Sequence, residues 1–582
     1  MIRPILAGLA ASATVALAAP AAHAAPPQPF GHTCTPQDGV LFCPTADDGQ
    51  RVASFDGVPL DVDLTLPPTG DGPFPTIVMM HGWGGSKRSF ESHSPAGGYN
   101  NVFYAQHGYA VVTYTARGWG RSCGALDSRT VPACDRGWIH LADQRYEERD
   151  TQHLLGLLVD QGVTSASAIG VTGVSYGGIQ TLNLARLRNR VRLEDGSFAP
   201  WRSPNGTPLA IRAGYARWAG SDMTYALQPN GRFTDFRTPR RNDAIRPGGV
   251  MKKSYNDVLY ASGVTGGFYE PAGGPFNADI TTWKLLADLG EPERRDALAV
   301  GRELTGFHSW AGLSGPSAAL IVQNGWTDDL FPAPEALRVY RTFRAAPGAR
   351  LSLQLGDLGH PRGSNDAGMT AAMTAQGNSF FDFYLKGQGS APRHGSVLAY
   401  TQGCPGYPAT ARFRAENWER LHPRSVGMGH RRPLRMSSRG GDAATAAAVD
   451  PIVGGGKACA TVPAKRASGT ATIGRRFGKP FTLLGMPTVE SRIRTKGRGG
   501  FIAARLWDVH GGQQLLVSRG LYRLRDNQRG RVVFQLFGNG WRFAKGHTAK
   551  LELLGRDPNY LRTSNFKFSV RLARTRVELP GR

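Results

Sequence analysis

The chain has 582 residues, of which 41% are hydrophobic and 19% are charged, and this balance excludes a disordered protein. Its length exceeds that of one ordinary domain, so two or three domains are expected. The net charge of +25 is uneven: residues 395–582 carry 34 Lys+Arg against 10 Asp+Glu, or +24, which leaves +1 for residues 1–394. This basic third is expected either to be a solvated face or to bind an anionic envelope surface. No nucleic-acid-binding motif occurs, and no nucleic-acid partner is expected.

Residues 1–24 have the features of a secretory signal peptide. Arg3 supplies a positive charge, residues 4–18 are apolar, and Ala22-His23-Ala24 matches an A-x-A cleavage site. We therefore expect cleavage near Ala24 and a secreted, extracytoplasmic protein. A membrane anchor is disfavoured because the apolar segment is short, and no later segment is long enough to span a bilayer.

The cysteines agree with export, because an even number in an exported chain predicts disulfide bonds. Pairing in chain order is the simplest of 15 connectivities. The expected pairs are Cys34 with Cys43, Cys123 with Cys134, and Cys404 with Cys459. Neither C-x-x-C nor H-E-x-x-H occurs, so we expect no metal and no cofactor.

The first two-thirds of the mature chain alternates between apolar strands and amphipathic helices. Residues 34–44 predict a small disulfide-closed hairpin, and Asp56-Gly57 predicts a second turn. Strands buried on both faces are then predicted at residues 75–82, 109–118, 168–175, 211–218, 317–328 and 350–360, with helices at residues 148–162, 177–189 and 333–345. This alternation predicts a doubly wound α/β domain over residues 25–394.

Three segments depart from this alternation. Residues 219–316 mix polar turns with amphipathic stretches and predict a helical cap over the sheet. Residues 387–396 predict a linker, and residues 438–457 predict a long flexible loop. Short alternating strands from Thr482 onward predict an antiparallel β-sandwich of the jelly-roll kind, so the second domain is placed at residues 395–582.

Two segments match G-x-S-x-G, and their context separates them. Ser175, in Gly173-Val174-Ser175-Tyr176-Gly177, has a predicted strand before it and a predicted helix after it, as the nucleophile elbow of an α/β-hydrolase requires. Ser122, in residues 120–124, precedes a turn-like segment and adjoins Cys123. We therefore predict that Ser175 is a nucleophile and that Ser122 is a structural turn residue.

A serine nucleophile needs a histidine base that is oriented by a carboxylate, and in this fold the chain order is Ser, then Asp or Glu, then His. Asp328 follows the next-to-last predicted strand, with Asp329 as the alternative, and His360 follows the last one. The three predicted catalytic residues are Ser175, Asp328 and His360. If Asp329 is not catalytic, we expect it to cap the next helix.

An oxyanion hole needs backbone N–H groups that point at the developing charge. The N–H of Tyr176 is expected to supply one. The segment from His81 to Gly85, HGWGG, is similar to the glycine-rich oxyanion loop of lipases, and it is expected to supply the other from Trp83, with Gly82 as the alternative. His81 itself is interpreted as a turn residue.

Together these motifs resemble the X-Pro dipeptidyl-peptidase and cocaine-esterase family of α/β-hydrolases. The similarity rests on DGVPLDVDLTLP, ARGWGRSCG, GVSYGG, NGWTDD, GDLGH and FFDFYLKG, and on GFIAARLWDVHGGQQLLVSRGLYRL and AKLELLGRDPNY in the C-terminal domain. The resemblance covers nearly the whole mature chain. It implies the same catalytic triad, a helical cap, and acyl transfer to water through an acyl-enzyme.

Two departures from the family pattern concern substrate recognition. The esterase branch supplies a tyrosine hydroxyl to the oxyanion hole, where this chain has HGWGG. The α-amino acid ester hydrolases place acidic residues two and three positions after the catalytic aspartate to hold a substrate ammonium, and here these positions are Leu330 and Phe331. Asp222 or a carboxylate of the cap would have to replace them.

The predicted activity is a secreted serine hydrolase that cleaves a peptide or amide with proline near its N-terminus. The alternative is a carboxylic ester hydrolase, and the substrate is a small peptide or ester in either case. An alternative of another class is a non-catalytic envelope-binding protein that kept the fold.

Overall fold

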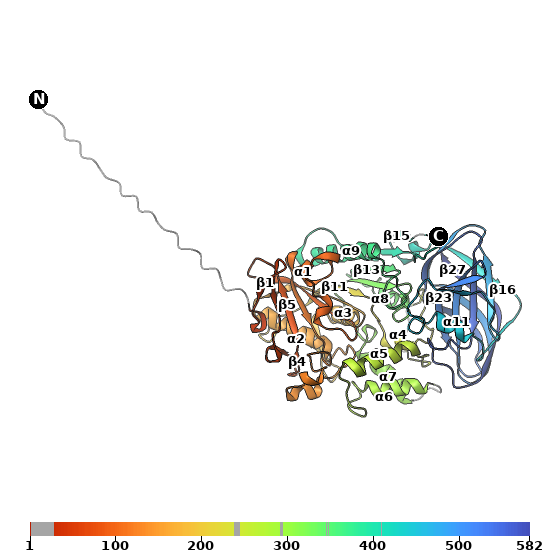
Figure 1. Ribbon diagram of the computed structural model, residues 1–582, viewed down its shortest axis with the longest axis horizontal. Coiled ribbons are helices and arrows are strands. Elements are labelled where there is room, and N and C mark those ends of the chain that lie inside the picture. The colour runs from red at the N-terminus through yellow and green to blue at the C-terminus, as the bar shows by residue number, and fades with distance from the viewer. Residues whose placement is uncertain (2–27, 238–244, 291–294, 345, 347, 409) are drawn as a thin grey trace.

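The computed structural model describes residue 1 and residues 28–237, 245–290, 295–344, 346, 348–408 and 410–582 (Figure 1). The predicted signal peptide therefore lies outside the described residues, apart from Met1. The described chain forms an α/β part and, at the other end of the molecule, a β-rich C-terminal part. No helix in the described ranges is both long and apolar enough to cross a membrane.

One large sheet of eleven strands forms the centre of the α/β part, in the order β1-β2-β5-β7-β6-β8-β11-β12-β13-β14-β15. The strands from β7 to β14 are parallel to their neighbours, whereas the pairs at both edges are antiparallel. The bounds are β1 (Thr35–Gln37), β2 (Val40–Cys43), β5 (Val62–Leu66), β6 (Phe74–Met80), β7 (Ala110–Tyr114), β8 (Thr164–Val174), β11 (Ile211–Arg217), β12 (Ala319–Gly325), β13 (Leu351–Gly356), β14 (Val397–Tyr400) and β15 (Arg412–Ala415). Two small hairpins lie outside this sheet, β3 (Val52–Ala53) with β4 (Pro59–Leu60) and β9 (Arg190–Arg192) with β10 (Phe198–Pro200).

Both faces of the sheet are buried, as the apolar runs predict. Along β6, Val78 and Met80 belong to one hydrophobic cluster, and Ile77 and Met79 belong to another. Helices α3 and α9 both contact β8 and β11, and α8 contacts β12 and β13. The helices of this part are α1 (Asn101–Gln106), α2 (Glu147–Asp160), α3 (Tyr176–Leu187), α8 (Ala333–Arg344) and α9 (Ala367–Lys386).

The predicted strands and helices of this part are confirmed, and the predicted α/β-hydrolase fold class follows from their order. The longest helix of this part, the 20-residue α9, was not predicted from the sequence. The sheet also extends past residue 394, where the domain boundary was predicted, because β14 pairs with β13 and β15 pairs with β14.

The described parts of the segment between β11 and β12 contain helices that are joined by turns and irregular stretches. The helices are α4 (Met223–Leu227), α5 (Lys253–Gly266), α6 (Ile280–Leu289) and α7 (Arg295–Phe307). Figure 1 shows these helices beside the sheet, between the α/β part and the C-terminal strands. This segment corresponds to the predicted cap.

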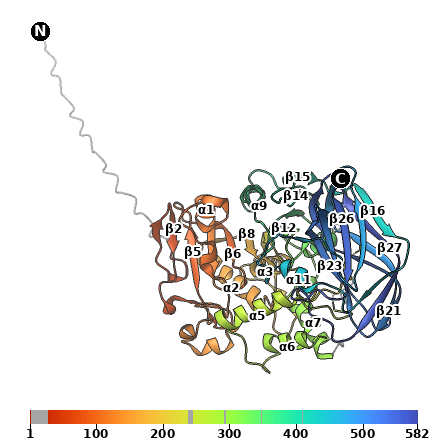
Figure 2. The same cartoon turned by 45° about the vertical axis from the view of Figure 1, so that its right-hand side comes forward.

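The C-terminal part is a β-sandwich of two antiparallel sheets, as Figure 2 also shows. One sheet has the order β24-β21-β27-β20-β25, with β16 and β17 also paired to β27, and the other has the order β18-β23-β22-β26-β19. A core of aliphatic and aromatic side chains, including Ile493, Leu506 and Phe534, fills the space between them. The strands are β16 (Arg424–His430), β17 (Leu434–Ser437), β18 (Thr461–Pro463), β19 (Ala471–Arg476), β20 (Phe481–Gly485), β21 (Thr488–Gly497), β22 (Phe501–His510), β23 (Gln513–Arg523), β24 (Arg529–Gln535), β25 (Asn539–Phe543), β26 (Thr548–Leu554) and β27 (Phe568–Gly581).

One sequence prediction in this part is wrong. Residues 438–457, predicted as a flexible loop, contain helix α11 (Ala443–Ala448). The Asp442 carboxylate caps this helix by accepting a hydrogen bond from the backbone N–H of Thr445 at 2.8 Å. A second short helix, α10 (Trp418–Leu421), precedes β16.

The three disulfide bonds join the cysteines in chain order, as predicted. They are Cys34–Cys43, Cys123–Cys134 and Cys404–Cys459. The first closes the predicted hairpin, because β1 and β2 lie between its two cysteines. Such bonds are typical of proteins that fold in an oxidising compartment.

Candidate active site

Ser175 occupies a sharp turn between β8 and α3. Its backbone has φ 56° and ψ −113°, a conformation that is strained for a residue with a side chain. The flanking glycines are required by close backbone contacts: a Cβ on Gly177 would lie 2.0 Å from the carbonyl oxygen of Met80, and one on Gly173 would lie 2.6 Å from the same oxygen. The G-x-S-x-G pattern therefore lets the turn pass directly against the end of β6.

Ser175, His360 and Asp328 form a continuous chain of hydrogen bonds. Ser175 Oγ lies 2.8 Å from His360 Nε2, and His360 Nδ1 lies 2.7 Å from Asp328 Oδ2. Because the carboxylate accepts from Nδ1–H, Nε2 of the neutral imidazole is an acceptor for the serine hydroxyl. The three residues that were predicted from strand-end positions, 153 and 32 residues apart in sequence, thus converge at one point.

Asp328 is fully buried and is held by the backbone around it. Its Oδ1 accepts hydrogen bonds from the N–H groups of Leu330 and Phe331, both at 2.9 Å. Gly359 has φ +112°, and a Cβ there would lie 2.3 Å from Asp328 Oδ2. The glycine before His360 therefore leaves room for the carboxylate to approach the imidazole.

Asp329, the alternative triad acid, has different partners. Its carboxylate forms ion pairs with Arg362 at 2.7 Å and with Arg519 of β23 at 3.4 Å, and both arginines are buried. The Tyr560 hydroxyl donates to the Asp329 carbonyl oxygen at 2.9 Å. Asp329 thus connects the loop after β12 with the loop that carries His360 and with the β-sandwich.

The HGWGG loop lies against Ser175. A Cβ on Gly82 would be 3.8 Å from the Cβ of Ser175. The Trp83 ring packs edge-on against Tyr176, and its indole N–H donates to the Leu259 carbonyl oxygen of α5 at 3.0 Å. The loop therefore joins the end of β6 to the cap, and Tyr176 begins α3, where backbone N–H groups have no acceptor within the helix.

His81 has a structural environment. It is buried, its Nδ1 lies 2.7 Å from the Gly82 carbonyl oxygen, and its Nε2 accepts from the N–H of Ala116 at 2.9 Å. Burial lowers the pKa of His81 to about 4, against a smaller opposing effect of the Gly82 carbonyl. The ring is therefore neutral at physiological pH, in agreement with its interpretation as a turn residue.

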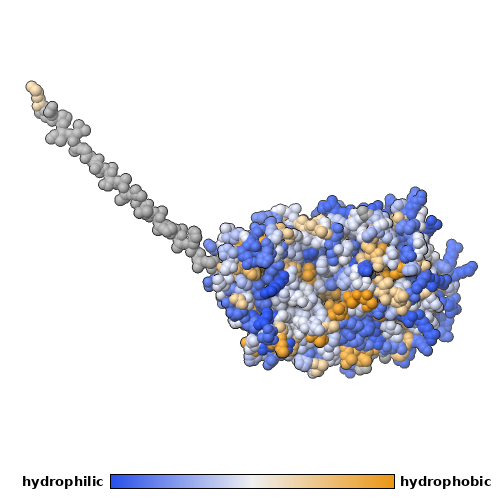
Figure 3. All heavy atoms as spheres, in the orientation of Figure 1, coloured by the Kyte–Doolittle hydropathy of each residue, from blue (hydrophilic) through white to orange (hydrophobic). Residues whose placement is uncertain are grey.

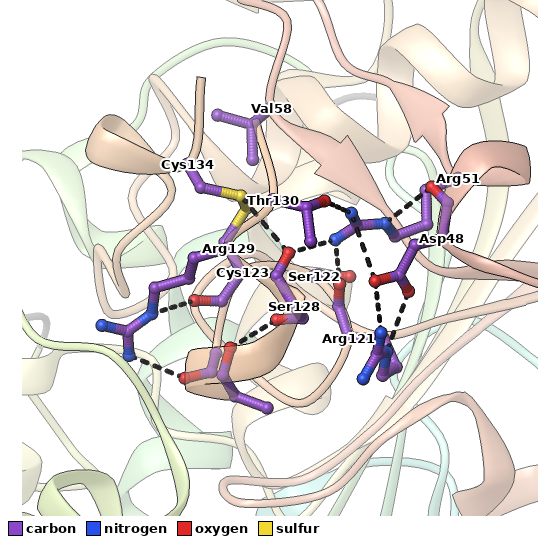
Figure 4. The surroundings of a disulfide bond; sticks show 12 residues. Asp48, Arg51, Val58, Arg121, Ser122, Cys123, Ser128, Arg129, Thr130 and Cys134 are labelled. Carbon is purple, nitrogen blue, oxygen red and sulfur yellow. Dashed lines mark hydrogen bonds and ion pairs between the residues drawn. A yellow bond between two sulfur atoms is a disulfide. The ribbon is translucent and has the colours of Figure 1, made fainter. Parts of the chain in front are cut away.

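Ser122, in the second G-x-S-x-G segment, is buried beside the disulfide bond of Cys123 and Cys134 (Figure 4). Its hydroxyl donates to the Thr115 carbonyl oxygen at 2.6 Å and accepts from the N–H of Asp61 at 2.9 Å. The neighbouring Cys123 is bonded to Cys134, and Arg51 donates to the backbone oxygens of Arg121 and Ser128 on the same loop. The hydroxyl therefore donates to one backbone group and accepts from another, and both partners lie outside the G-x-S-x-G segment.

A group of Asp143, Glu303 and His308 lies under the cap and has the composition of a metal site. The Arg145 guanidinium binds both carboxylates, at 2.5 Å from Asp143 Oδ2 and in a hydrogen bond to Glu303. The Arg145 guanidinium therefore already occupies both carboxylates, and the group joins the α/β part to α7.

An apolar cavity of about 100 Å³ opens at Ser175. Trp83 and Tyr176 line it from the sheet side, and Leu330 and Phe331 line it from the loop after β12. The cap supplies the opposite wall, mainly through Met223, Leu227, Leu259, Tyr260, Trp283 and Leu304. Sequence reasoning did not identify these cap residues, because apolar side chains on a helix have the same pattern whether they face a core or a cavity.

The charges around this cavity are few. Among the described residues that line it there is no carboxylate, and the one charged side chain is Lys284, which pairs with Asp257 and Asp288. Asp222 is not part of the lining: its carboxylate accepts from the N–H of Tyr225 at the start of α4 and from the Thr305 hydroxyl. The arrangement suits an uncharged acyl group.

Comparison with known proteins indicates that the chain is a hydrolase. Residues 56–191 match the family model described as X-Pro dipeptidyl-peptidase (S15 family). No curated protein matches the chain. The predicted resemblance to the X-Pro dipeptidyl-peptidase and cocaine-esterase family is therefore confirmed by a family model over that range.

Several solved structures have a similar fold over nearly the whole chain. A CocE/NonD family hydrolase from Staphylococcus aureus has a TM-score of 0.59 at 13% identity, with 93% of this chain and 94% of that chain covered. An α-amino acid ester hydrolase has a TM-score of 0.58 at 14% identity, with 94% and 97% covered. An aminopeptidase from a marine sediment Thaumarchaeota archaeon has a TM-score of 0.56 at 15% identity, with 96% and 98% covered. These likenesses confirm the α/β-hydrolase fold with its C-terminal β-sandwich.

Proposed function

We propose that this α/β hydrolase is an exported serine hydrolase in which Ser175 is the nucleophile, His360 the base and Asp328 the orienting acid. The observation that supports this proposal is the hydrogen-bond chain Ser175–His360–Asp328 at the mouth of an apolar cavity. Export is supported by the features of residues 1–24 and by three disulfide bonds.

In this mechanism Ser175 Oγ attacks the substrate carbonyl carbon while its proton passes to His360 Nε2. The backbone N–H groups of Tyr176 and Trp83, with Gly82 as the alternative to Trp83, stabilise the oxyanion of the tetrahedral intermediate. His360 then gives the proton to the leaving oxygen or nitrogen, and an acyl-Ser175 remains. Water, deprotonated by His360, attacks this ester. His360 then returns the proton to Ser175 Oγ as the acyl–oxygen bond breaks, and the carboxylic acid is released.

We propose an ester with an uncharged, apolar acyl group as the substrate class. A substrate with a free N-terminus would bring an ammonium into the cavity, and an unpaired buried charge costs several kcal/mol. The described lining offers no carboxylate to pair with it, since the two positions that are acidic in α-amino acid ester hydrolases are Leu330 and Phe331 here. This reverses the order of preference that the sequence suggested, in which the peptidase activity came first.

The second candidate is cleavage of peptides with proline near the N-terminus. The match of residues 56–191 to the X-Pro dipeptidyl-peptidase model favours it. The two candidates use the same acyl transfer and differ in the group that occupies the cavity.

Assays with p-nitrophenyl esters of acetate to dodecanoate and with Gly-Pro-p-nitroanilide distinguish these candidates. We expect ester turnover that increases with acyl length and then declines, and that disappears in Ser175→Ala. Turnover of the anilide without ester turnover would favour the peptidase. Turnover that survives Ser175→Ala would exclude the mechanism, and no turnover of either substrate would favour the non-catalytic envelope-binding alternative.

A further inference from the structure

The outer face of one sheet of the β-sandwich carries a row of four arginines. Arg494 of β21 lies opposite Arg529 of β24 on one side and opposite Arg571 of β27 on the other, and Arg571 lies opposite Arg435 of β17. Directly opposed residues in antiparallel strands project from the same face of the sheet. All four are exposed, so the row crosses the paired strands β24, β21, β27 and β17 at the surface.

The fold does not require these charges. The alternate residues of the same strands, such as Ile493, Val570 and Leu572, point inward and form the core of the sandwich. Like charges directly opposite each other destabilise a sheet. In the part of the chain that the structure describes, none of the four arginines has an ion-pair partner, and the nearby Glu490 carboxylate is already bound by Arg531 at 2.7 Å.

The repulsion within the row is relieved when an anion binds along it. We propose that this row binds a linear polymer that carries phosphate groups. Neighbouring strands are about 4.8 Å apart, so four arginines offer a track of about 14 Å. The guanidinium group donates two parallel hydrogen bonds to a phosphate, which a lysine ammonium cannot do.

The surface around the row favours a polymer over a membrane. Proteins that bind at a lipid surface insert apolar side chains beside their basic residues. Among the large apolar side chains that are exposed in the described ranges, none belongs to β17, β21, β24 or β27. Figure 3 shows strongly hydrophilic side chains projecting from the end of the molecule that the sandwich forms.

The high net charge of the C-terminal third adds a long-range attraction for polyanions to the local binding along the row. Residues 395–582 carry +24, so the whole region attracts polyanions over a distance set by the ionic strength. Attraction by net charge alone would be insensitive to which arginines are removed. Binding along the row depends on four particular side chains, and this difference makes the proposal testable.

The test measures binding of the full-length protein to immobilised long-chain inorganic polyphosphate over a range of NaCl concentrations. Each phosphate contact on a single-stranded polyanion contributes about −0.7 to the slope of log affinity against log salt, so four contacts predict a slope of about −3. The double variant Arg494→Gln/Arg571→Gln is expected to reduce this slope to about half. Its melting temperature is expected to stay constant or rise, because like charges are removed from opposed positions.

The matched control is Arg412→Gln/Arg414→Gln, which removes the same charge from exposed positions on β15 of the other domain. We expect its slope to equal that of the unmodified protein. Equal losses in the two double variants would overturn the proposal in favour of net charge alone. Tighter binding to phosphatidylglycerol vesicles than to polyphosphate, or equal binding to polyglutamate, would overturn the choice of a phosphate polymer.

Discussion

On the sheet side of Ser175, the nucleophile and the orienting carboxylate are positioned by backbone groups, whereas on the cap side the cavity wall consists mainly of apolar side chains from four helices. The hydroxyl of Ser175 is positioned by a turn between β8 and α3, and Asp328 by two backbone N–H groups after β12. The cap wall, with Leu259, Trp283 and Leu304, has no such fixed polar contacts to the reacting atoms. Under the proposed function, the sheet side carries out the acyl transfer and the cap side selects the acyl group.

The largest expected effect lies on the sheet side. Ser175→Ala is expected to lower kcat by about 10⁶ for every substrate, because the nucleophile is lost and only binding and the oxyanion hole remain. Ser122→Ala is the matched control. It removes a hydroxyl from the other G-x-S-x-G segment and leaves the Asp61 N–H unsatisfied, so it is expected to cost about 1–3 kcal/mol of stability without changing kcat.

Rates are measured with the best nitrophenyl ester, and stability is measured by urea unfolding. A loss of kcat in Ser122→Ala comparable to that in Ser175→Ala would show that the two segments are not distinguished as the structure indicates.

The second-largest expected effect distinguishes the roles of two adjacent carboxylates, those of Asp328 and Asp329. Asp328→Asn is expected to lower kcat by about 10⁴ with little change in stability, because the amide favours the wrong tautomer of His360. Asp329→Asn removes the partner of two buried arginines, Arg362 and Arg519, and is expected to cost about 3–5 kcal/mol of folding stability.

The readouts are kcat at a temperature where each variant is folded, and the free energy of unfolding. The comparison fails if Asp329→Asn loses activity as Asp328→Asn does while remaining equally stable, since Asp329 would then be the orienting acid.

A smaller effect is expected on the cap side. Trp283, like Val300 and Leu304, lines both the cavity at Ser175 and a second cavity beside α6 and α7, so its side chain is part of the wall between them. Trp283→Ala is expected to connect the two and to raise kcat/KM for a decanoyl ester, relative to a butyryl ester, by about tenfold. Leu285→Ala, on the same helix but with its side chain 60% exposed, is the control and should leave the ratio unchanged. An unchanged ratio in Trp283→Ala would show that the acyl group lies elsewhere.

The contrast between the sheet side and the cap side also explains which parts of the site could be predicted from the sequence. Ser175 and His360 were identified because each follows a buried strand, and the carboxyl ends of parallel strands meet at one edge of a sheet. The choice between Asp328 and Asp329 needed side-chain geometry, because both follow β12. Arg519 and Tyr560 contact Asp329 from a different domain, and no local pattern marks such a contact.

Two errors of assignment also have physical reasons. The segment FFDFYLKG, which forms the end of α9, was interpreted only as a family motif, and the apolar spacing of residues 367–386 was not tested as a helix. Helix α11 lies between glycines that indicated a loop, although Asp442 before an alanine run is a helix start signal.

The smallest expected effect concerns the one charged residue among the described side chains of the cavity. Burial lowers the pKa of Lys284, but hydrogen bonds to Asp288 and Asp257 outweigh this effect and raise the pKa above its usual value. The ammonium is therefore charged and already paired, and it has little attraction left for a substrate. Lys284→Met is expected to change kcat/KM for neutral esters by less than about threefold. Lys253→Met, which also removes a partner of Asp257 but lies outside the cavity lining, controls for the lost ion pair. If Lys284→Met selectively abolished turnover of an ester with a terminal carboxylate, the cavity would be specific for anionic acyl groups, and the contrast between a polar sheet side and an apolar cap side would fail.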